Sequence, residues 1–367
     1  MKKYITGAAM ALGLSTFPAA VDASFSDVSI YQDEIDYLTE RNIIQGYDND
    51  EFRPNNTVTR LQAVQMILRG LQVEPDGENS AEFSDINAGD YGYDEISAAV
   101  ELGIISGKTN SKTGEQYFDP YAPLTRSQMA KILTNAYALE EEWNYFFADI
   151  SHDHWAKDYV DTLASHGIST GYEDRTFRPD QQIKRSHFAL FMARMLDDRF
   201  VEGDVMENVS YMPDPKDYVT EDENFRTTYE FLDFKEDSSQ YWKVSREDLQ
   251  EYSMDFGEIS VSYVGYKETA EGLFSKDAPS VELFDSRDFL IELPYPLENG
   301  EKFQYLYTYD GTVHLLDSYE TDGQIYKNVV YIDSSGGPNG NELIDSYYAP
   351  NKGYIDGEFG YAGGDPY

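Results

Sequence analysis

The sequence of 367 residues contains no cysteine, few basic residues and a single long apolar stretch, which lies at its start. Without cysteine the chain has no disulfides, no thiolate nucleophile and no cysteine-ligated metal site. Packing must therefore supply its stability. Because no apolar run of membrane-spanning length follows the first one, we expect no membrane insertion of the chain beyond it.

Basic residues are scarce, since 28 Lys and Arg stand against 68 Asp and Glu and the net charge is −40. The part from residue 200 onward is the more acidic, with 11 basic against 36 acidic residues. Such a charge disfavours nucleic acid and anionic membranes as partners. It also repels an anionic polymer, although salt largely screens that repulsion beyond a Debye length of about 8 Å. Binding to a polyanion would therefore need local cationic pockets.

The apolar stretch at the start has the features of a secretory signal peptide. Met1-Lys2-Lys3 is positively charged, residues 5–17 are apolar, and Val21-Asp22-Ala23 resembles a cleavage site. We therefore expect removal of residues 1–23 on export. A buried N-terminal helix or a transmembrane anchor fits less well, because the apolar core is short.

One sequence pattern occurs three times before residue 197. Its copies begin 58 and then 64 residues apart, and each contains an F-x-D element, a glycine turn, an F-x-P element and a basic helix start. Repeats of this period form arrays in which each unit buries its apolar face on its neighbours. The F-x-D elements are Phe25-Ser26-Asp27, Phe83-Ser84-Asp85 and Phe147-Ala148-Asp149, and the glycine turns end at Gly46, Gly107 and Gly171. The F-x-P elements are Phe52-Arg53-Pro54, Phe118-Asp119-Pro120 and Phe177-Arg178-Pro179. The basic helix starts are Val58-Thr59-Arg60, Leu124-Thr125-Arg126 and Ile183-Lys184-Arg185.

Each copy predicts two helices from the spacing of its apolar residues. The first helices are expected over 32–41, 93–102 and 155–166, and the second from Arg60, Arg126 and Arg185 onward. Thr59 with Gln62 and Thr125 with Gln128 have the spacing of a capping box. In the third copy Lys184 and His187 stand in these places, so the capping box is lost and a cation is gained.

These elements resemble the S-layer homology (SLH) family, whose tandem modules attach bacterial proteins non-covalently to cell-wall polysaccharide. The resemblance covers Phe25 to Leu196 and implies a pseudo-symmetric trimer of helical hairpins. It also implies a secreted protein of the cell wall or S-layer, bound to secondary cell-wall polysaccharide through a sugar that carries an acidic pyruvate ketal. We expect no cofactor, no metal and no nucleic acid partner.

The resemblance implies a glycan pocket at the start of each second helix. There, free N–H groups, the helix dipole and an arginine would suit a carboxylate. The alternative is that each arginine is a surface residue, because Thr-Arg at a helix start is frequent for capping alone, and that Trp155 is a core aromatic. The implied glycan-binding residues are the cations Arg60, Arg126, Arg185 and Lys184; Trp155 and Tyr91, which share one position that Ile30 fills in the first copy; and the close-approach turns Gly46, Gly107 and Gly171.

Two short clusters resemble metal sites but lack the full ligand set. His152-Asp153-His154 has no third fixed ligand at a known spacing, and Asp48-Asn49-Asp50 lacks the rest of a calcium loop. We therefore expect neither to hold a metal.

After residue 199 the composition changes. Residues 200–223 are acidic, contain Pro213 and Pro215, and predict a linker. From residue 224 onward, aromatic and β-branched runs predict a mainly antiparallel β domain with hairpins at Asp310-Gly311 and Asp322-Gly323. Of 31 Tyr, 19 follow residue 200, which fits strands with one wet face or, alternatively, a sugar-stacking surface. The expected strands are 227–235, 258–267, 281–293, 303–309, 313–319, 326–333 and 347–355.

Three motifs of this half resemble elements of exported β domains of uncertain function, similar in outline to lipoprotein half-barrels. They fit turn and strand geometry and carry no catalytic group, so they suggest a fold and not a function. The motifs are P-L-E-N-G over 296–300, G-Q-I-Y-K-N-V-V over 323–330 and the Y-A-P-x-x-G element within 347–355.

The sequence thus predicts an α+β multidomain protein, in which a three-repeat α-helical SLH pseudo-trimer precedes a mainly antiparallel β domain. The expected boundaries are 24–79, 80–142 and 143–199 for the repeats, 200–223 for the linker and 224–367 for the β domain. The expected function is wall anchoring with display of a binding or structural β domain, and no residue is identified as catalytic. Alternatives are a structural S-layer subunit or a wall-anchored polysaccharide hydrolase, which would need two close carboxylates, one with a raised pKa.

Overall fold

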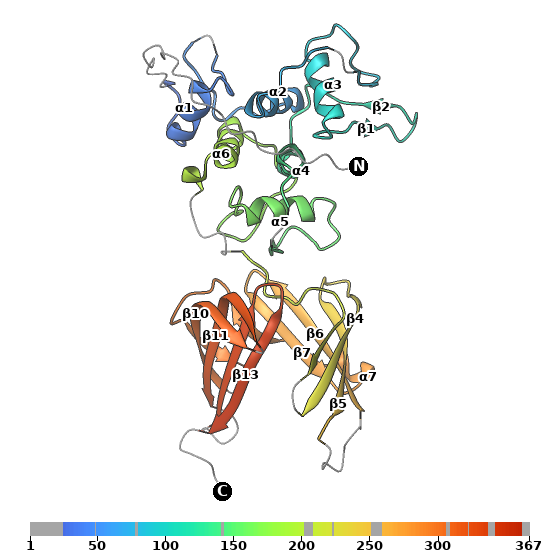
Figure 1. Ribbon diagram of the computed structural model, residues 1–367, viewed down its shortest axis with the longest axis vertical. Coiled ribbons are helices and arrows are strands. Elements are labelled where there is room, and N and C mark those ends of the chain that lie inside the picture. The colour runs from blue at the N-terminus through green and yellow to red at the C-terminus, as the bar shows by residue number, and fades with distance from the viewer. Residues whose placement is uncertain are drawn as a thin grey trace.

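The computed structural model describes residues 25–47, 49–77, 80–140, 143–201, 208–221, 224–250, 259–305, 309–321, 323–336 and 342–361, so the expected signal peptide lies outside it. A helical domain and a β domain follow one another along the long axis (Figure 1). None of the described helices is long and apolar enough to cross a membrane. Each repeat supplies two helices, as predicted: α1 (Gln32–Glu40) and α2 (Arg60–Gly70), α3 (Tyr93–Glu101) and α4 (Arg126–Tyr137), and α5 (Lys157–Ser165) and α6 (Arg185–Leu196).

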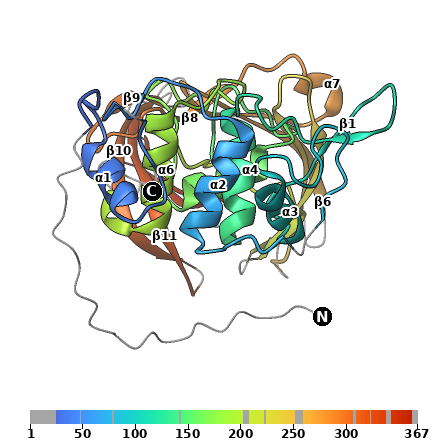
Figure 2. The same ribbon diagram turned by 90° about the horizontal axis from the view of Figure 1, so that it is seen from above.

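The first helix of each repeat packs against the second helix of the preceding repeat. Helix α3 packs on α2, α5 packs on α4, and α1 packs on α6, which closes the repeats into a ring. Seen from above, α2, α4 and α6 lie in the middle of this ring with α1 and α3 outside them (Figure 2). The pseudo-trimer is confirmed, but its packing unit is a pair of helices from two repeats and not a hairpin within one.

Three backbone hydrogen bonds join the repeats in a closed cycle. The N–H of Val58 donates to the carbonyl of Ile183 at 3.1 Å, that of Ile183 to Leu124 at 2.9 Å, and that of Leu124 to Val58 at 2.8 Å. All three residues are fully buried. Because water cannot reach these amides, each repeat depends on another to satisfy its backbone there.

The first N–H groups of each second helix also donate to another repeat. At α2, the N–H of Arg60 donates to the carbonyl of Ala122 at 3.0 Å and that of Leu61 to Pro120 at 2.9 Å. The same bonds occur at α4, where Arg126 and Ser127 donate to Gln181 and Pro179, and at α6, where Arg185 and Ser186 donate to Asn56 and Pro54. Both predicted capping boxes are confirmed at α2 and α4, and α6 has no side-chain cap.

The aspartate of each F-x-D element fixes the F-x-P loop of its own repeat. Asp27 accepts from the N–H groups of Phe52 and Arg53 at 2.7 and 2.8 Å. These bonds hold Arg53 at φ 60°, a left-handed conformation that residues other than glycine rarely adopt. Asp85 and Asp149 hold Asp119 and Arg178 in the same way.

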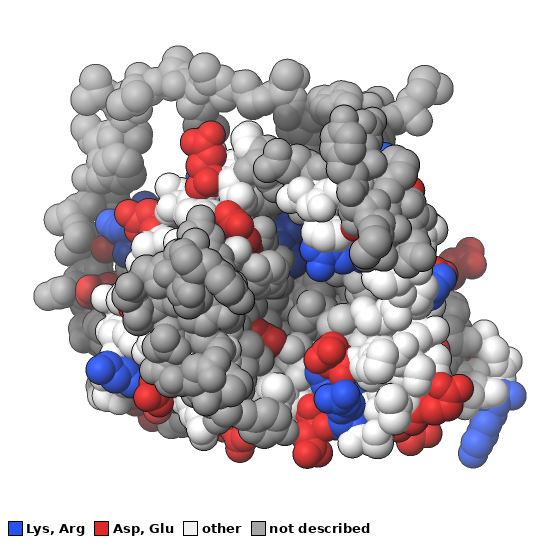
Figure 3. Space-filling model, turned by 90° about the horizontal axis from the view of Figure 1, so that it is seen from below, with Lys and Arg blue, Asp and Glu red and all other residues white. Residues whose placement is uncertain are grey.

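The β domain consists of two antiparallel sheets that face each other (Figure 1). At the end away from the repeats the molecular surface is hollowed at its centre (Figure 3). One sheet has the order β3 (Tyr218–Glu221), β4 (Phe225–Phe234), β5 (Gln240–Asp248), β6 (Ile259–Thr269), β7 (Gly272–Ala278) and β8 (Leu290–Pro294), with the short helix α7 (Val281–Phe284) beside it. The other has the order β13 (Gly353–Tyr361), β12 (Glu342–Ala349), β11 (Gln324–Gly336), β10 (Tyr309–Thr321) and β9 (Lys302–Tyr305).

The antiparallel β fold is confirmed, whereas several predicted boundaries are wrong. The expected strand 281–293 divides into α7 and β8, and 347–355 is a hairpin of β12 and β13. Strands β5 and β7 were not predicted. Their sequences mix charged and polar residues with aromatic ones, which hides the period of a strand.

The predicted hairpin at Asp310-Gly311 is also wrong, because both residues lie inside β10, paired with Gln304 and Phe303 of β9. A Cβ on Gly311 would lie 3.0 Å from the Phe303 ring, so glycine permits close packing here and not a turn. Gly323, at φ 73°, does lie in the turn between β10 and β11. Asp322 lies outside the described residues.

Part of the expected linker is interior to the protein. Asn208, Val209, Ser210 and Tyr211 are between 1% and 7% exposed, and β3 belongs to the first sheet. Val209 and Tyr211 join one apolar cluster that extends from the repeats into the β domain. Acidic residues and prolines surround this short buried segment, which is why composition alone suggested a linker.

Replacing Asp27 with Ala should lower the free energy of unfolding by about 1–3 kcal/mol at neutral pH, because two N–H groups lose their acceptor. Partial burial raises the pKa of Asp27, but the bonds from Phe52 and Arg53 outweigh it, so the pKa is lowered. The stability from this group is therefore present above the unfolded pKa of about 3.9 and lost as pH falls through the folded value.

Urea unfolding of the full chain at several pH values measures this difference. The matched variant Asp180→Ala, at an exposed position of the third repeat, should stay within about 0.5 kcal/mol of the wild type. An Asp27→Ala deficit that persists unchanged in acid would contradict the assigned role of the carboxylate.

Candidate functional site

Each second helix begins with an arginine whose side chain is buried against another repeat. Arg60, Arg126 and Arg185 are 6%, 3% and 4% exposed. The Nε of each donates to a phenylalanine carbonyl, at 2.8, 2.7 and 3.0 Å, and its guanidinium lies 4.5–4.7 Å from the centre of that ring. We call these contacts inter-repeat junctions: junction 1 joins Arg60 to Phe118, junction 2 joins Arg126 to Phe177, and junction 3 joins Arg185 to Phe52.

Further contacts hold two of these guanidinium groups in place. Arg126 Nη2 donates to Ser169 Oγ at 3.4 Å, and Arg185 Nη2 donates to the Gln45 carbonyl at 2.9 Å. Burial lowers the pKa of all three arginines, yet arginine titrates so high that each remains charged. The alternative that they are surface residues is wrong, since their positive charges lie inside the ring of repeats.

The helix starts do not offer the free N–H groups that we expected from the sequence. The first two N–H groups of α2, α4 and α6 donate to carbonyls of another repeat. At α2 and α4 the third donates to the capping threonine at 3.3 Å. The positive end of the helix dipole remains, but at α2 and α4 an anion would have to meet a side chain and not the backbone. At α6 no side chain caps the third N–H, which belongs to His187.

The three turn glycines do permit a close approach, but the approaching group belongs to the protein. A Cβ would lie 2.2 Å from the Phe25 ring at Gly46, 2.2 Å from the Phe83 ring at Gly107 and 2.5 Å from the Phe147 ring at Gly171. Each ring is the phenylalanine of the F-x-D element of the same repeat. The glycines are therefore explained by packing inside each repeat.

The aromatic position of each repeat is exposed. Tyr91 is 70%, Trp155 54% and Ile30 52% exposed. The alternative that Trp155 is a core aromatic is therefore wrong. The Tyr91 hydroxyl accepts from Gln65 Nε2 of α2 at 3.1 Å, which places this ring beside the helix that begins with Arg60. Trp155 stacks on His154, with 5.8 Å between ring centres.

Lys184 lies at the surface of junction 3. Its Nζ donates to Asn55 Oδ1 of the first repeat at 3.1 Å. His187, at the position of the missing capping glutamine, lies edge-on to Tyr31 at 6.1 Å. Burial, and then the charges of Arg126 and Lys184, lower the pKa of His187, so it is neutral at neutral pH and Lys184 is the added cation.

The residues that resembled metal ligands have other contacts. The ring of His152 stacks on Phe234 of the β domain at 3.7 Å between centres, and His154 Nδ1 accepts from the N–H of Ala156 at 3.2 Å. In the described ranges, no group of three or more His, Asp or Glu side chains could hold a metal ion. Asp48 lies outside them.

Two carboxylates of the β domain have raised pKa values, as the hydrolase alternative would require of at least one. Burial is the main cause for both Glu268 and Glu292, and the hydroxyl groups around them oppose it. Glu292 accepts from Ser275, Tyr348 and Tyr305. Glu268 accepts from Ser210, Tyr295 and the N–H of Tyr211. With three protein donors each, these carboxylates have a structural role that accounts for their environment.

The tyrosines of the second sheet stack on one another. Tyr347 lies 4.0 Å from Tyr319 and 4.7 Å from Tyr331, and His314 stacks on Tyr331 at 5.2 Å, with interplanar angles of 14–25°. Rings in this arrangement cover each other's faces. This row therefore favours the ordinary interpretation of the tyrosines as strand residues over a sugar-stacking surface.

Comparison with known proteins agrees with the three repeats. Residues 24–64, 82–130 and 146–189 match the model of the S-layer homology domain. The chain is 34% identical over 179 residues to a surface-layer 125 kDa protein of Lysinibacillus sphaericus, and 30% identical over 203 residues to an S-layer protein of Bacillus thuringiensis subsp. finitimus. It is also 31% identical over 185 residues to an amylopullulanase of Thermoanaerobacterium thermosulfurigenes.

These similarities involve part of each protein. The match to the Lysinibacillus protein covers 47% of this chain and 15% of that protein, and the match to the Bacillus protein covers 53% and 24%. The match to the amylopullulanase covers 48% of this chain and 10% of the enzyme. The chain therefore spans less than a quarter of the length of the relatives it matches.

Replacing Glu292 with Gln should reduce the pH dependence of stability in the β domain. Because the folded pKa is raised, the stability linked to Glu292 is complete below the unfolded value of about 4.3 and is lost as pH rises through the folded value. The melting temperature of Glu292→Gln, relative to the wild type, should therefore rise with pH over that window.

Thermal unfolding of both proteins between pH 4 and 8 tests this. Glu298→Gln, an exposed site in the same domain, is the matched control and should show no such trend. A constant difference between Glu292→Gln and the wild type at every pH would contradict the effect of burial on this carboxyl group.

Proposed function

We propose that this chain, which carries three tandem S-layer homology domains, binds secondary cell-wall polysaccharide at its inter-repeat junctions and displays the β domain at the surface. S-layer homology domains imply anchoring at the cell surface, and the S-layer relatives indicate a secreted protein. The observation that carries the proposal is the recurrence, in each of the three repeats, of a buried arginine at the start of the second helix and an exposed aromatic or apolar residue ahead of the first helix.

The two kinds of residue have different tasks in this proposal. The arginines supply fixed positive charge, to which the dipole of each second helix adds at its start. In a chain of net charge −40, the local positive charge of these arginines would attract an acidic group such as a pyruvate ketal. Tyr91 and Trp155 offer ring faces for the apolar side of a sugar, and Lys184 offers a partly exposed cation at junction 3.

Arginine substitutions cannot test this proposal cleanly. Arg60, Arg126 and Arg185 each bond to a carbonyl of another repeat, so replacing them would disturb the ring as well as a bound glycan. Exposed residues avoid this difficulty. Substitutions at Tyr91 and Trp155 should leave the fold intact, because surface changes usually alter stability by less than about 0.5 kcal/mol.

The test is co-sedimentation of the full chain with cell-wall sacculi from the host. Trp155→Ala and Tyr91→Ala should each weaken binding by about tenfold, since burying a large apolar side chain stabilises by roughly 1.5–3 kcal/mol. Leu102→Ala is the matched control, because Leu102 is 53% exposed and lies at the far end of α3 from Tyr91.

Sacculi from which the pyruvate ketal has been removed chemically test the acidic group. They should retain less of the wild-type chain if the ketal is the group recognised. Unchanged sedimentation of the Tyr91→Ala, Trp155→Ala double variant would refute the junctions as the glycan site, whichever sacculi are used.

We infer a binding or structural role for the β domain. The donors around Glu268 and Glu292 leave these carboxylates engaged in the fold, which speaks against their use as an acid and base pair. The match with amylopullulanase covers 48% of this chain, which is about the extent of the repeats. It therefore gives no evidence of an enzymatic activity in the β domain.

A further inference from the structure

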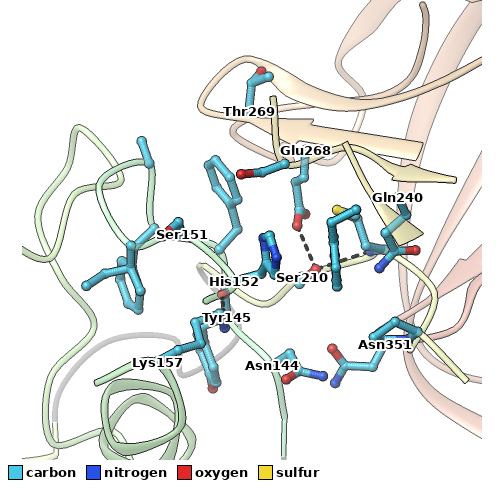
Figure 4. Close-up of a pocket in the computed structure, with 18 of the residues that line it drawn as sticks. Asn144, Tyr145, Ser151, His152, Lys157, Ser210, Gln240, Glu268, Thr269 and Asn351 are labelled. Carbon is cyan, nitrogen blue, oxygen red and sulfur yellow. Dashed lines mark hydrogen bonds between the residues drawn. The ribbon is translucent and has the colours of Figure 1, made fainter. Parts of the chain in front are cut away.

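A cavity of about 710 Å³ lies between the third repeat and the β domain (Figure 4). One side is formed by residues 144–152 and Lys157 of the repeat, and the other by Gln240, Glu268 to Ala270 and Asn351. Residues 210 and 212–215, from the segment between the domains, line it as well. Its size falls within the range of small-ligand sites, which occur preferentially between domains.

The two sides of the cavity are held together by contacts that do not involve a ligand. The N–H of Asn351 donates to the Ser210 carbonyl at 2.9 Å, and that of Asp214 to the Asn351 carbonyl at 3.1 Å. His152 of the repeat stacks on Phe234 of β4. The Y-A-P-x-x-G motif thus attaches the connecting segment to the β domain, and the cavity is preformed.

Several charged groups around the cavity are already engaged. Lys157 contacts the Tyr145 carbonyl and Asp161, Asp149 accepts two backbone N–H groups, and Asp237 pairs with Lys267 at 2.8 Å. The acidic side chains of the lining outnumber the basic ones. An anionic ligand is therefore disfavoured, and the described residues contain no cluster suited to a metal ion.

Two amide side chains of the lining point toward each other. Figure 4 shows Asn144 of the third repeat and Asn351 of the β domain pointing toward one another. Within the described part of the chain, Asn351 Oδ1 is buried and has no hydrogen-bond partner. A buried acceptor without a donor costs about 1–3 kcal/mol, so the Asn351 amide would gain a hydrogen bond by rotating toward a ligand hydroxyl in the cavity. Tyr145, His152 and Phe234 also line this cavity, with His152 and Phe234 stacked on each other.

We propose that this cavity binds a neutral sugar unit between the third repeat and the β domain. Amide groups both donate to and accept from hydroxyl groups, and the apolar part of the lining suits the C–H face of a sugar ring. The site is separate from the inter-repeat junctions, so it does not depend on the function proposed for them.

The experiment is saturation-transfer NMR of the full chain with free glucose, mannose, galactose, their N-acetylamino forms, cellobiose and chitobiose. At least one should bind, and Asn144→Leu and Asn351→Gly should each weaken its binding by about tenfold. Glycine suits position 351 because Asn351 has φ 57°. The matched controls are Asn87→Leu, at an exposed site of the second repeat, and Asn328→Gly, at φ 54° in β11; neither should change binding.

Binding of none of these sugars would overturn the proposal. So would binding that survives both cavity variants, or that is lost in the Tyr91→Ala, Trp155→Ala double variant, which would assign the signal to the junctions. Both cavity variants should still sediment with sacculi. Failure at the cavity is thereby distinguished from failure of wall anchoring.

Discussion

The closed cycle of hydrogen bonds among Val58, Leu124 and Ile183 is the constraint on which the helical domain depends. Around it, each second helix donates its first N–H groups to a different repeat, and its arginine donates to a phenylalanine carbonyl there. A single repeat would expose these groups to water together with the apolar faces that the other repeats cover, and would keep only a small apolar core. The repeat is therefore a unit of sequence, whereas the ring of three is the unit of folding.

Local features of the helical domain could be predicted because local residues determine them. The apolar spacing gave the six helices, and Thr59-Gln62 and Thr125-Gln128 gave the two capping boxes. The direction of packing could not be predicted, since a repeat period does not say whether an arginine meets its own repeat or the next. The phenylalanine partners of the arginines and glycines were missed, although the recurrence of F-x-D and F-x-P was a signal for them.

In the β domain, composition and turn signals led to wrong predictions. Gly311 lies in a strand at a point where Phe303 packs closely against it, and residues 208–211 are buried although their surroundings are acidic. The cavity could not be read from any motif, because Asn144 and Asn351 are more than two hundred residues apart and meet only once both domains are placed. Sites built by two domains have no local signature.

Ring closure also bears on the passage of the chain across the membrane. A translocated chain emerges unfolded and in sequence order, yet α1 packs on α6, and Phe52 accepts from Arg185, which is 133 residues away. The first repeat therefore cannot complete its packing until the third has emerged, and a partly emerged chain with two repeats cannot close the ring. Without cysteine, no disulfide can trap an intermediate in the meantime. The helical domain should thus fold in one late, cooperative step on the outer side, and until then its repeats remain open to wall proteases.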